Sequence, residues 1–317
     1  KEQRIKGFYY MNQDNGIIFF ILGWFVLLLI GGWYIFQNMD TDGYYFQMKH
    51  IQLKRHGHHK TSDMIAYDRN DLSYNTIQIP RLPVELLKIK RTPIWLAFII
   101  LPLISALIGT GNYLNNIDIL SSTWFSLWTQ HALFFCYFFM PPLVGVYASY
   151  LWRMEHNGSN WNMVLVNTSA WRIVFDKIVV CAVITFFTLG WLCLLYIICG
   201  LYVGFTEPVP AKLFEWLACG ILGGIAVCTA QCFLSLVIRS FAVPIGMALL
   251  GGFAGLAVTA SGHYYLLPYS LMSMGMRANN PNLTMDIAEF VNYSVFFSIL
   301  FYLLSVWYIK SHDVRTQ

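Results

Sequence analysis

The sequence predicts an all-α fold, a polytopic transmembrane helical bundle, and three observations lead to this class. The 317 residues are 57% hydrophobic and only 11% charged, whereas a soluble domain has about a quarter of its residues charged. Apolar stretches recur at lengths near the roughly 20 residues that cross about 30 Å of hydrocarbon. Basic residues gather on alternate sides of these stretches, as the positive-inside rule requires. A water-soluble fold of this composition would expose large apolar patches, so lipid is the expected solvent.

The predicted spans divide the chain into two parts. Residues 1–82 hold an extra N-terminal hydrophobic helix at Ile17–Phe36 and a polar cytoplasmic linker. Residues 83–317 hold a six-helix core. Its spans are expected at Ile94–Tyr113, Trp124–Trp152, Ile173–Gly204, Phe214–Ile238, Val243–Leu267 and Ala288–Ile309. Pro141-Pro142 predicts a kink or break in the second of these six, because proline cannot donate a backbone hydrogen bond.

The basic residues at the ends of the six core spans predict the orientation. One set of ends is strongly basic and is expected to be cytoplasmic. It carries Lys88, Lys90, Arg91, Arg153, Arg172, Lys177, Arg239, Lys310 and Arg315. The other set, expected outside, carries Lys212 and Arg277. Several aromatic residues are expected near the outer interface, either as an aromatic belt or as contacts for an amphipathic peptide. They are Trp124, Trp128, Tyr264, Tyr265 and Tyr269.

A short amphipathic segment precedes the first core span. Glu85, Lys88, Lys90 and Arg91 alternate with apolar residues, which predicts a helix in the inner interface with its basic groups near anionic headgroups. Thr92-Pro93 then turns the chain into the membrane.

A second segment connects the second and third core spans. Residues 153–177 begin polar and become amphipathic, with Trp161, Val164 and Leu165 at helical spacing. Such a helix could press against a cytoplasmic motor protein. It could equally be an ordinary loop with an interfacial helix, and the periodicity alone favours this second interpretation.

Polar residues inside or beside the spans allow two interpretations. Gln130, His131, Gln231 and His263 could line a substrate path, because polar groups in a membrane are costly and often functional. Hydrogen bonding between helices is the commoner explanation. The glycines of 251–255 are expected to allow close helix packing rather than phosphate binding. The seven cysteines are expected to act as small apolar residues.

The order of these features resembles the ABC-2 type permeases, and within them the lantibiotic-protection (bacteriocin immunity) permeases of Gram-positive bacteria. The resemblance runs from about Pro83 to the C-terminus. The matching pieces are LLKIKRTPIW at 86–95, SLW at 126–128, YLWRMEH at 150–156, Asp176-Lys177 and WYIKSHDV at 307–314. Asn167-Thr168-Ser169 stands where the family usually has a proline. Residues 1–82 have no counterpart.

The resemblance implies a six-helix ABC-2 permease core and a transmembrane permease subunit that is not itself an enzyme. A second permease, identical or related, and two cytoplasmic ABC ATPase subunits would be its partners. The substrate would be an amphipathic antimicrobial peptide expelled from the plasma membrane. The chain would hold no cofactor, since ATP and Mg²⁺ would bind the partner ATPase. The residues expected to contact the ATPase are Glu155, His156, Trp161, Arg172 and Lys177, in a helix spanning Glu155–Ser169.

Two other functions remain open. The chain could be an ABC-2 permease that exports a self-made peptide, a drug or a glycan. It could also be a membrane sensor or accessory protein that transports nothing. His56, His58 and His59 in the linker keep this second alternative open, although a basic linker is more often solvated chain. An intramembrane enzyme is disfavoured because the sequence contains no H-E-x-x-H motif, and nothing in it points to nucleic acid.

Overall fold

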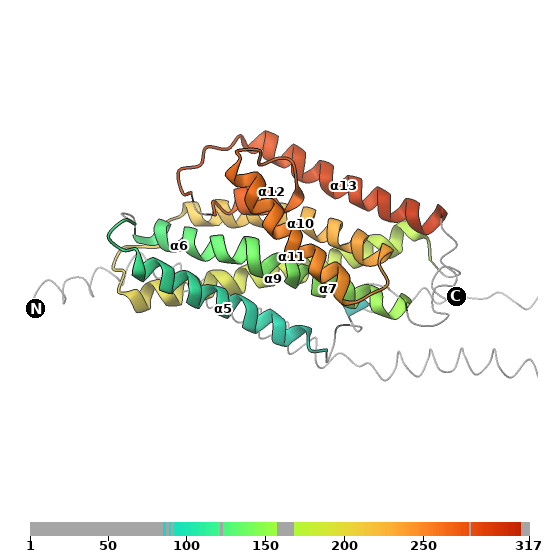
Figure 1. The fold of residues 1–317 in the computed structure, drawn as a ribbon, viewed down its shortest axis with the longest axis horizontal. Helices are drawn as coiled ribbons and strands as arrows, with labels where there is room; N and C mark the ends of the chain where they lie inside the picture. The colour runs from blue at the N-terminus through green and yellow to red at the C-terminus, as the bar shows by residue number, and fades with distance from the viewer. Residues whose placement is uncertain are drawn as a thin grey trace, which may run out of the picture.

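The computed structural model describes most of the predicted core. It covers Glu85, Leu86, Ile89 and the ranges 92–120, 123–156, 168–278 and 280–311, with only the backbone of Met154. The predicted helix Ile17–Phe36 and its linker lie outside the described residues, as do Lys88, Lys90, Arg91 and Trp161. Within the described ranges the regular structure is entirely helical, which confirms the all-α class (Figure 1).

The described helices form a bundle in which most axes run roughly along one direction (Figure 1). They are α5 Ile94–Asn115, α6 Thr123–Phe134, the π-helical turn η1 Phe135–Phe139, α7 Met140–His156, α9 Ala170–Val203, α10 Lys212–Val237, α11 Ala242–Ala260, α12 Pro268–Gly275 and α13 Ile287–Ser311. Six runs among the described residues are long and apolar enough to cross a membrane, with α6, η1 and α7 forming one of them. The six-span core is therefore confirmed, and the chain is a multi-pass membrane protein.

The run from α6 to α7 is continuous where a kink or break was predicted. Pro141 and Pro142 lie in the first turn of α7, and the wider turn η1 immediately precedes them. A proline has no N–H to donate to a carbonyl of the preceding turn, and π-helical turns often form where the regular ladder is interrupted. Gly252 of α11 packs against this turn, where a Cβ would overlap the Tyr137 carbonyl oxygen. The glycine thus lets α11 approach the interrupted turn closely.

The span predicted at Val243–Leu267 is wrong at its outer end. α11 stops at Ala260, Gly262 reverses the chain at φ 81°, and Pro268 begins the separate helix α12. All eight residues of α12 are buried. Tyr269 at its start bonds to Gln231 of α10, while Gly275 at its end packs on Cys219. The segment after α11 therefore folds back into the bundle, and α12 runs antiparallel to α10.

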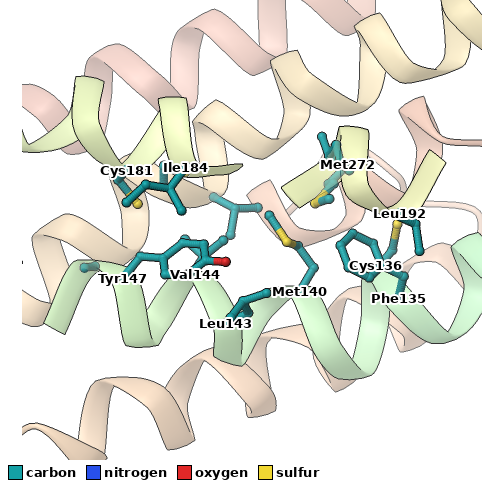
Figure 2. Close-up of a cluster of buried hydrophobic side chains, with 14 of the residues drawn as sticks. Phe135, Cys136, Met140, Leu143, Val144, Tyr147, Cys181, Ile184, Leu192 and Met272 are labelled. Carbon is teal, nitrogen blue, oxygen red and sulfur yellow. The ribbon is translucent and has the colours of Figure 1, made fainter. Parts of the chain in front are cut away.

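The core lies between η1, α7, α9 and α12. Figure 2 shows Met140 and Val144 of α7 on the side of the helix that faces Cys181 and Ile184 of α9, whereas Leu143 lies on its other side. Met272 of α12 belongs to the same cluster. The span containing α6, η1 and α7 is 67% buried in its apolar window, whereas that of α13 is 11% buried. The first is the centre of the bundle, and the second presents its apolar side chains to the lipid.

The predicted outer aromatic belt is wrong for its two tryptophans. Trp124 and Trp128 are buried, and both rings contact Tyr196 edge-on at 5.4 and 5.2 Å. Their indole N–H groups donate to the carbonyls of Glu207 and Met276. These rings stabilise the bundle from within because each N–H has an acceptor there. Tyr264 and Tyr265 are half-buried and Tyr269 is buried.

Candidate functional site at the inner end of the bundle

The inner end of the bundle is the end that carries Arg153, Arg172, Lys177, Arg239 and Lys310, and it is the predicted cytoplasmic side. Its central feature is the buried ammonium group of Lys177 in the second turn of α9. Lys177 Nζ lies 2.9 Å from Glu85 Oε2 and 3.1 Å from Glu155 Oε2, and it donates to the carbonyl of Leu151. The ammonium also lies 4.6 Å from the centroid of the Trp152 ring. Glu85 and the Leu151 carbonyl accept hydrogen bonds from the ammonium, and Glu155 pairs with its charge, so the buried cation has both hydrogen-bond acceptors and opposite charge around it.

The network joins three separate segments of the chain. Glu85 precedes α5, Glu155 lies in the last turn of α7, and Lys177 lies near the start of α9. Residues 157–167, which connect α7 to α9, lie outside the described residues, but both ends of this connection are fixed by the network. Because Lys177 binds both carboxylates, a displacement of α7 relative to α9 disturbs the Glu85 segment as well.

The burial of these residues corrects their expected roles. The exposed fractions of Glu85, Glu155 and Lys177 are 4%, 1% and 0%. Glu155 and Lys177 are therefore not available for direct contact with an ATPase. Glu85 does not face lipid headgroups, because it is directed into the bundle toward Lys177. A buried charge requires a partner more strongly than an exposed one, and here Lys177 pairs with both carboxylates.

The short segment before α5 is helical where it is described. Glu85, Leu86 and Ile89 have helical conformation. The carbonyl of Ile89 accepts from Thr92 Oγ1 at 2.8 Å and from Trp95 Nε1 at 3.2 Å. These bonds secure the turn into α5 that Thr92-Pro93 predicted.

Two further polar groups reach the surface beside this network. Arg172 is 61% exposed, and its Nε donates to both carboxylate oxygens of Asp176 at 3.1 and 3.2 Å. His156 is half-buried, and its Nε2–H donates to the carbonyl of Ser235 at 2.8 Å. Burial lowers the pKa of His156 below its ordinary value, and the bond to Ser235 and the nearby Glu155 only partly oppose this. Of the predicted contact residues that are described, Arg172 is the most accessible.

The ends of the predicted coupling helix, Glu155–Ser169, belong to other elements. Glu155 and His156 complete α7, while Ser169 is the N-cap of α9. Ser169 Oγ accepts from the backbone N–H of Arg172 at 3.4 Å, and its own backbone is extended. A serine in this position satisfies one of the open donors at a helix start. Ser169 thus begins α9 at the place where the family that the sequence resembles usually has a proline.

Three of the four candidate path residues bond within the bundle. Asn112 Nδ2 donates to Gln130 Oε1 at 2.6 Å, which joins α5 to α6. His131 Nε2 and Thr110 Oγ1 share a hydrogen bond of 2.9 Å between the same helices. Gln231 Nε2 donates to the hydroxyl of Tyr269. His263 lies apart in the exposed connection after α11. The expectation of hydrogen bonding between helices is confirmed for the first three.

The sequence comparisons agree with this architecture. A family model described as "ABC-2 family transporter protein" matches residues 82–255, which is more than half of the chain and includes Glu85, Glu155 and Lys177. No curated protein and no solved structure matches the chain. The match covers α5 to α10 and the first part of α11. With six membrane-spanning helices and a matching family model over most of its core, the chain belongs to the ABC-2 family of transporter proteins.

Proposed function

We propose that the chain is the transmembrane permease subunit of an ABC transporter that expels an amphipathic antimicrobial peptide from the plasma membrane. Membership of the ABC-2 family supports a transport role in association with ABC ATPases. The peptide, of the lantibiotic or bacteriocin class, is proposed from the resemblance in the segments LLKIKRTPIW and YLWRMEH. ATP is hydrolysed by a partner subunit, and a second permease, identical or related, completes the path. A Gram-positive cell is the expected setting.

The observation that carries this proposal is the ion network around Lys177. An ATPase that docks on residues 157–167 pushes on a connection whose two ends are anchored by Glu155 and Lys177. Removing one partner from a buried ion pair costs about 3–5 kcal/mol, so the network moves as a unit rather than breaking. Movement of the connection is then transmitted to α7, to α9 and to the segment at Glu85 together.

The coupling residues take revised roles in this proposal. Arg172 and His156 lie on the accessible side of the network and contact the ATPase. Trp161, which lies outside the described residues, is retained as a contact residue from its spacing in the sequence. Glu155 and Lys177 act indirectly by holding the inner ends of α7 and α9 in register.

The test is copurification of an ATPase from native membranes in a mild detergent. We expect an ATPase to accompany the wild-type chain and to be lost, or to hydrolyse ATP without stimulation by the permease, in the variant Trp161→Ala/Arg172→Ala. Lys212→Ala removes an exposed basic residue at the opposite end and is the matched control, with no expected loss. If no ATPase accompanies the wild-type chain under any mild condition, the permease function is wrong. A sensor or accessory role then becomes the leading function.

The substrate class needs a separate measurement. Cells that produce the chain together with its ATPase are expected to tolerate a higher concentration of a lantibiotic than cells carrying Trp161→Ala/Arg172→Ala. Tolerance that does not change, while the ATPase still copurifies, would remove the antimicrobial peptide from the proposal. The export of a self-made peptide, a drug or a glycan would then be favoured.

A further inference from the structure

A small cavity opens at the inner end, on the side of α7 that faces the connection from α10 to α11. Its volume is about 180 Å³. Six of its eight lining residues are polar or basic, and none of the described lining residues is acidic. The lining residues are Ser149, Arg153, His156, Ser235, Ile238, Arg239, Ser240 and Phe241. We call this space the basic cavity, and it borders the Lys177 network at His156.

Aromatic contacts position the first arginine of the basic cavity. The guanidinium carbon of Arg153 lies 5.9 Å from the ring centroid of Tyr150 and 5.7 Å from that of Phe241, and these two rings contact each other edge-on. A guanidinium held by aromatic rings keeps its N–H donors available, because they lie in its own plane. Arg153 is therefore fixed at the cavity while it remains able to bind an anion.

Among the described residues, no carboxylate pairs with the two arginines of the basic cavity. Glu155, on the same turn as Arg153, is already bound to Lys177. Arg153 and Arg239 are both exposed but line the same cavity, so their like charges repel each other. An anion between them removes this repulsion.

Other donors face or border the same space. Ser149 and Ser235 are linked by their hydroxyls at 3.3 Å, and Ser240 adds a third hydroxyl. α11 begins beside the cavity, because its N-cap Phe241 is a lining residue and gives no side-chain cap to the helix. The positive end of this helix and its open N–H groups add to the attraction for an anion. Guanidinium, hydroxyl and backbone N–H donors together suit the oxygens of a phosphate group.

We propose that the basic cavity binds a phosphate group, carried either by an anionic lipid headgroup or by a soluble phosphate compound. The volume is several times the roughly 30 Å³ that one water molecule occupies, so a phosphate with part of a glycerol fits. Phe241 and Val243 are exposed apolar residues beside the cavity and can contact acyl chains. At the inner interface, where anionic lipids gather around basic residues, a lipid is the more abundant source. The site does not depend on the proposed transport function.

The experiment uses the full chain in detergent and two ligands. Native mass spectrometry measures retention of phosphatidylglycerol against phosphatidylcholine at equal concentrations. Thermal unfolding in sodium phosphate, against sodium chloride at matched ionic strength, tests the soluble source. Arg153→Gln/Arg239→Gln removes the two cations, and Lys212→Gln/Lys310→Gln removes the same charge from other exposed positions. Ser240→Trp keeps both arginines and fills the cavity, so it still tests the site if the arginine variant fails to fold.

The expected result is preferential retention of phosphatidylglycerol by the wild-type chain. This preference falls about tenfold in the arginine variant and in Ser240→Trp, as expected for the loss of charge-assisted hydrogen bonds, and persists in the lysine control. Stabilisation by inorganic phosphate, lost in the same two variants and without lipid preference, supports the site with a soluble ligand. Equal lipid retention in all variants, with no effect of phosphate, overturns the proposal.

Discussion

At the inner end, three segments meet around one buried ammonium group, whereas α10 and α12 in the outer half meet at glycines. Lys177 is bound by Glu85 and Glu155. In the outer half, Gly223 lets α10 approach α12 so closely that a Cβ on it would lie 2.7 Å from the Met272 backbone. Lipid gives helices no hydrophobic reason to associate, so close packing at small residues is the usual substitute. The inner end uses charge, and its stability therefore depends on all three partners at once.

The largest effect is expected from Lys177→Met. This change removes the ammonium and leaves two buried carboxylates facing each other, at a cost of about 3–5 kcal/mol in the free energy of unfolding. Denaturant unfolding in detergent measures it. Glu85→Gln/Lys177→Met/Glu155→Gln removes all three charges and is expected to recover most of the loss.

Lys310→Met is the matched control for that variant, because Lys310 is exposed and, in the described part of the chain, its ammonium lies over the ring of Trp171 at 4.9 Å without an ion pair. It should unfold close to the wild type. If Lys177→Met were no less stable than Lys310→Met, the ion network would not hold the inner end together, and the contrast with the outer half would disappear.

An intermediate effect is expected from Gly223→Ala. The added methyl group meets backbone rather than a movable side chain, so α10 and α12 must separate, at a cost of about 1–3 kcal/mol. Thermal unfolding measures the change. Gly246→Ala is the control, since a Cβ there meets no described atom within 4 Å, and it should be neutral or slightly stabilising because alanine favours the helix. Equal behaviour of the two variants would contradict close packing as the basis of the outer half.

The smallest effect is expected from Trp128→Phe. The indole Nε1–H donates to the carbonyl of Met276 at 2.7 Å in a buried setting, and its loss leaves that carbonyl unpaired at a cost of about 1–2 kcal/mol. The same unfolding measurement applies. Trp171→Phe serves as the control, because Trp171 is 43% exposed and phenylalanine keeps a ring face for Lys310. If Trp128→Phe lost as much unfolding free energy as Lys177→Met, the neutral hydrogen bond of Trp128 would stabilise the bundle as strongly as the ion network, and the contrast would be wrong.

The spans could be predicted from the sequence because lipid thickness sets their length and apolar character. The span predicted at Val243–Leu267 is the exception, and it shows the limit of this rule. Residues 264–267 are apolar enough to extend the predicted span, but the chain already reverses at Gly262. The re-entry of α12 depends on glycines of α10, which hydropathy along one segment does not reveal.

The candidate site was predicted in its residues but not in its geometry. Glu155 and Lys177 stood out in the sequence, yet both were expected at a contact surface. Their true partner Glu85 lies 92 positions from Lys177, and only the packing of α7 against α9 brings the three together. Arg153 and Arg239 were not predicted to act together, because nothing in their spacing shows that they share a cavity.

The π-helical turn η1 also affects how this protein can be compared with its relatives. Such a turn accommodates one residue more than an α-helical turn, and each residue of an α-helix rotates by about 100°. A helical wheel drawn without interruption from Thr123 to His156 therefore assigns one half of the run to the wrong face. A relative that lacks one residue within 135–139 would keep Trp128 and Glu155 facing the same neighbours with an unbroken α-helix. A one-residue gap in an alignment at this turn would therefore mean that the two proteins keep the same helix contacts on both sides of it.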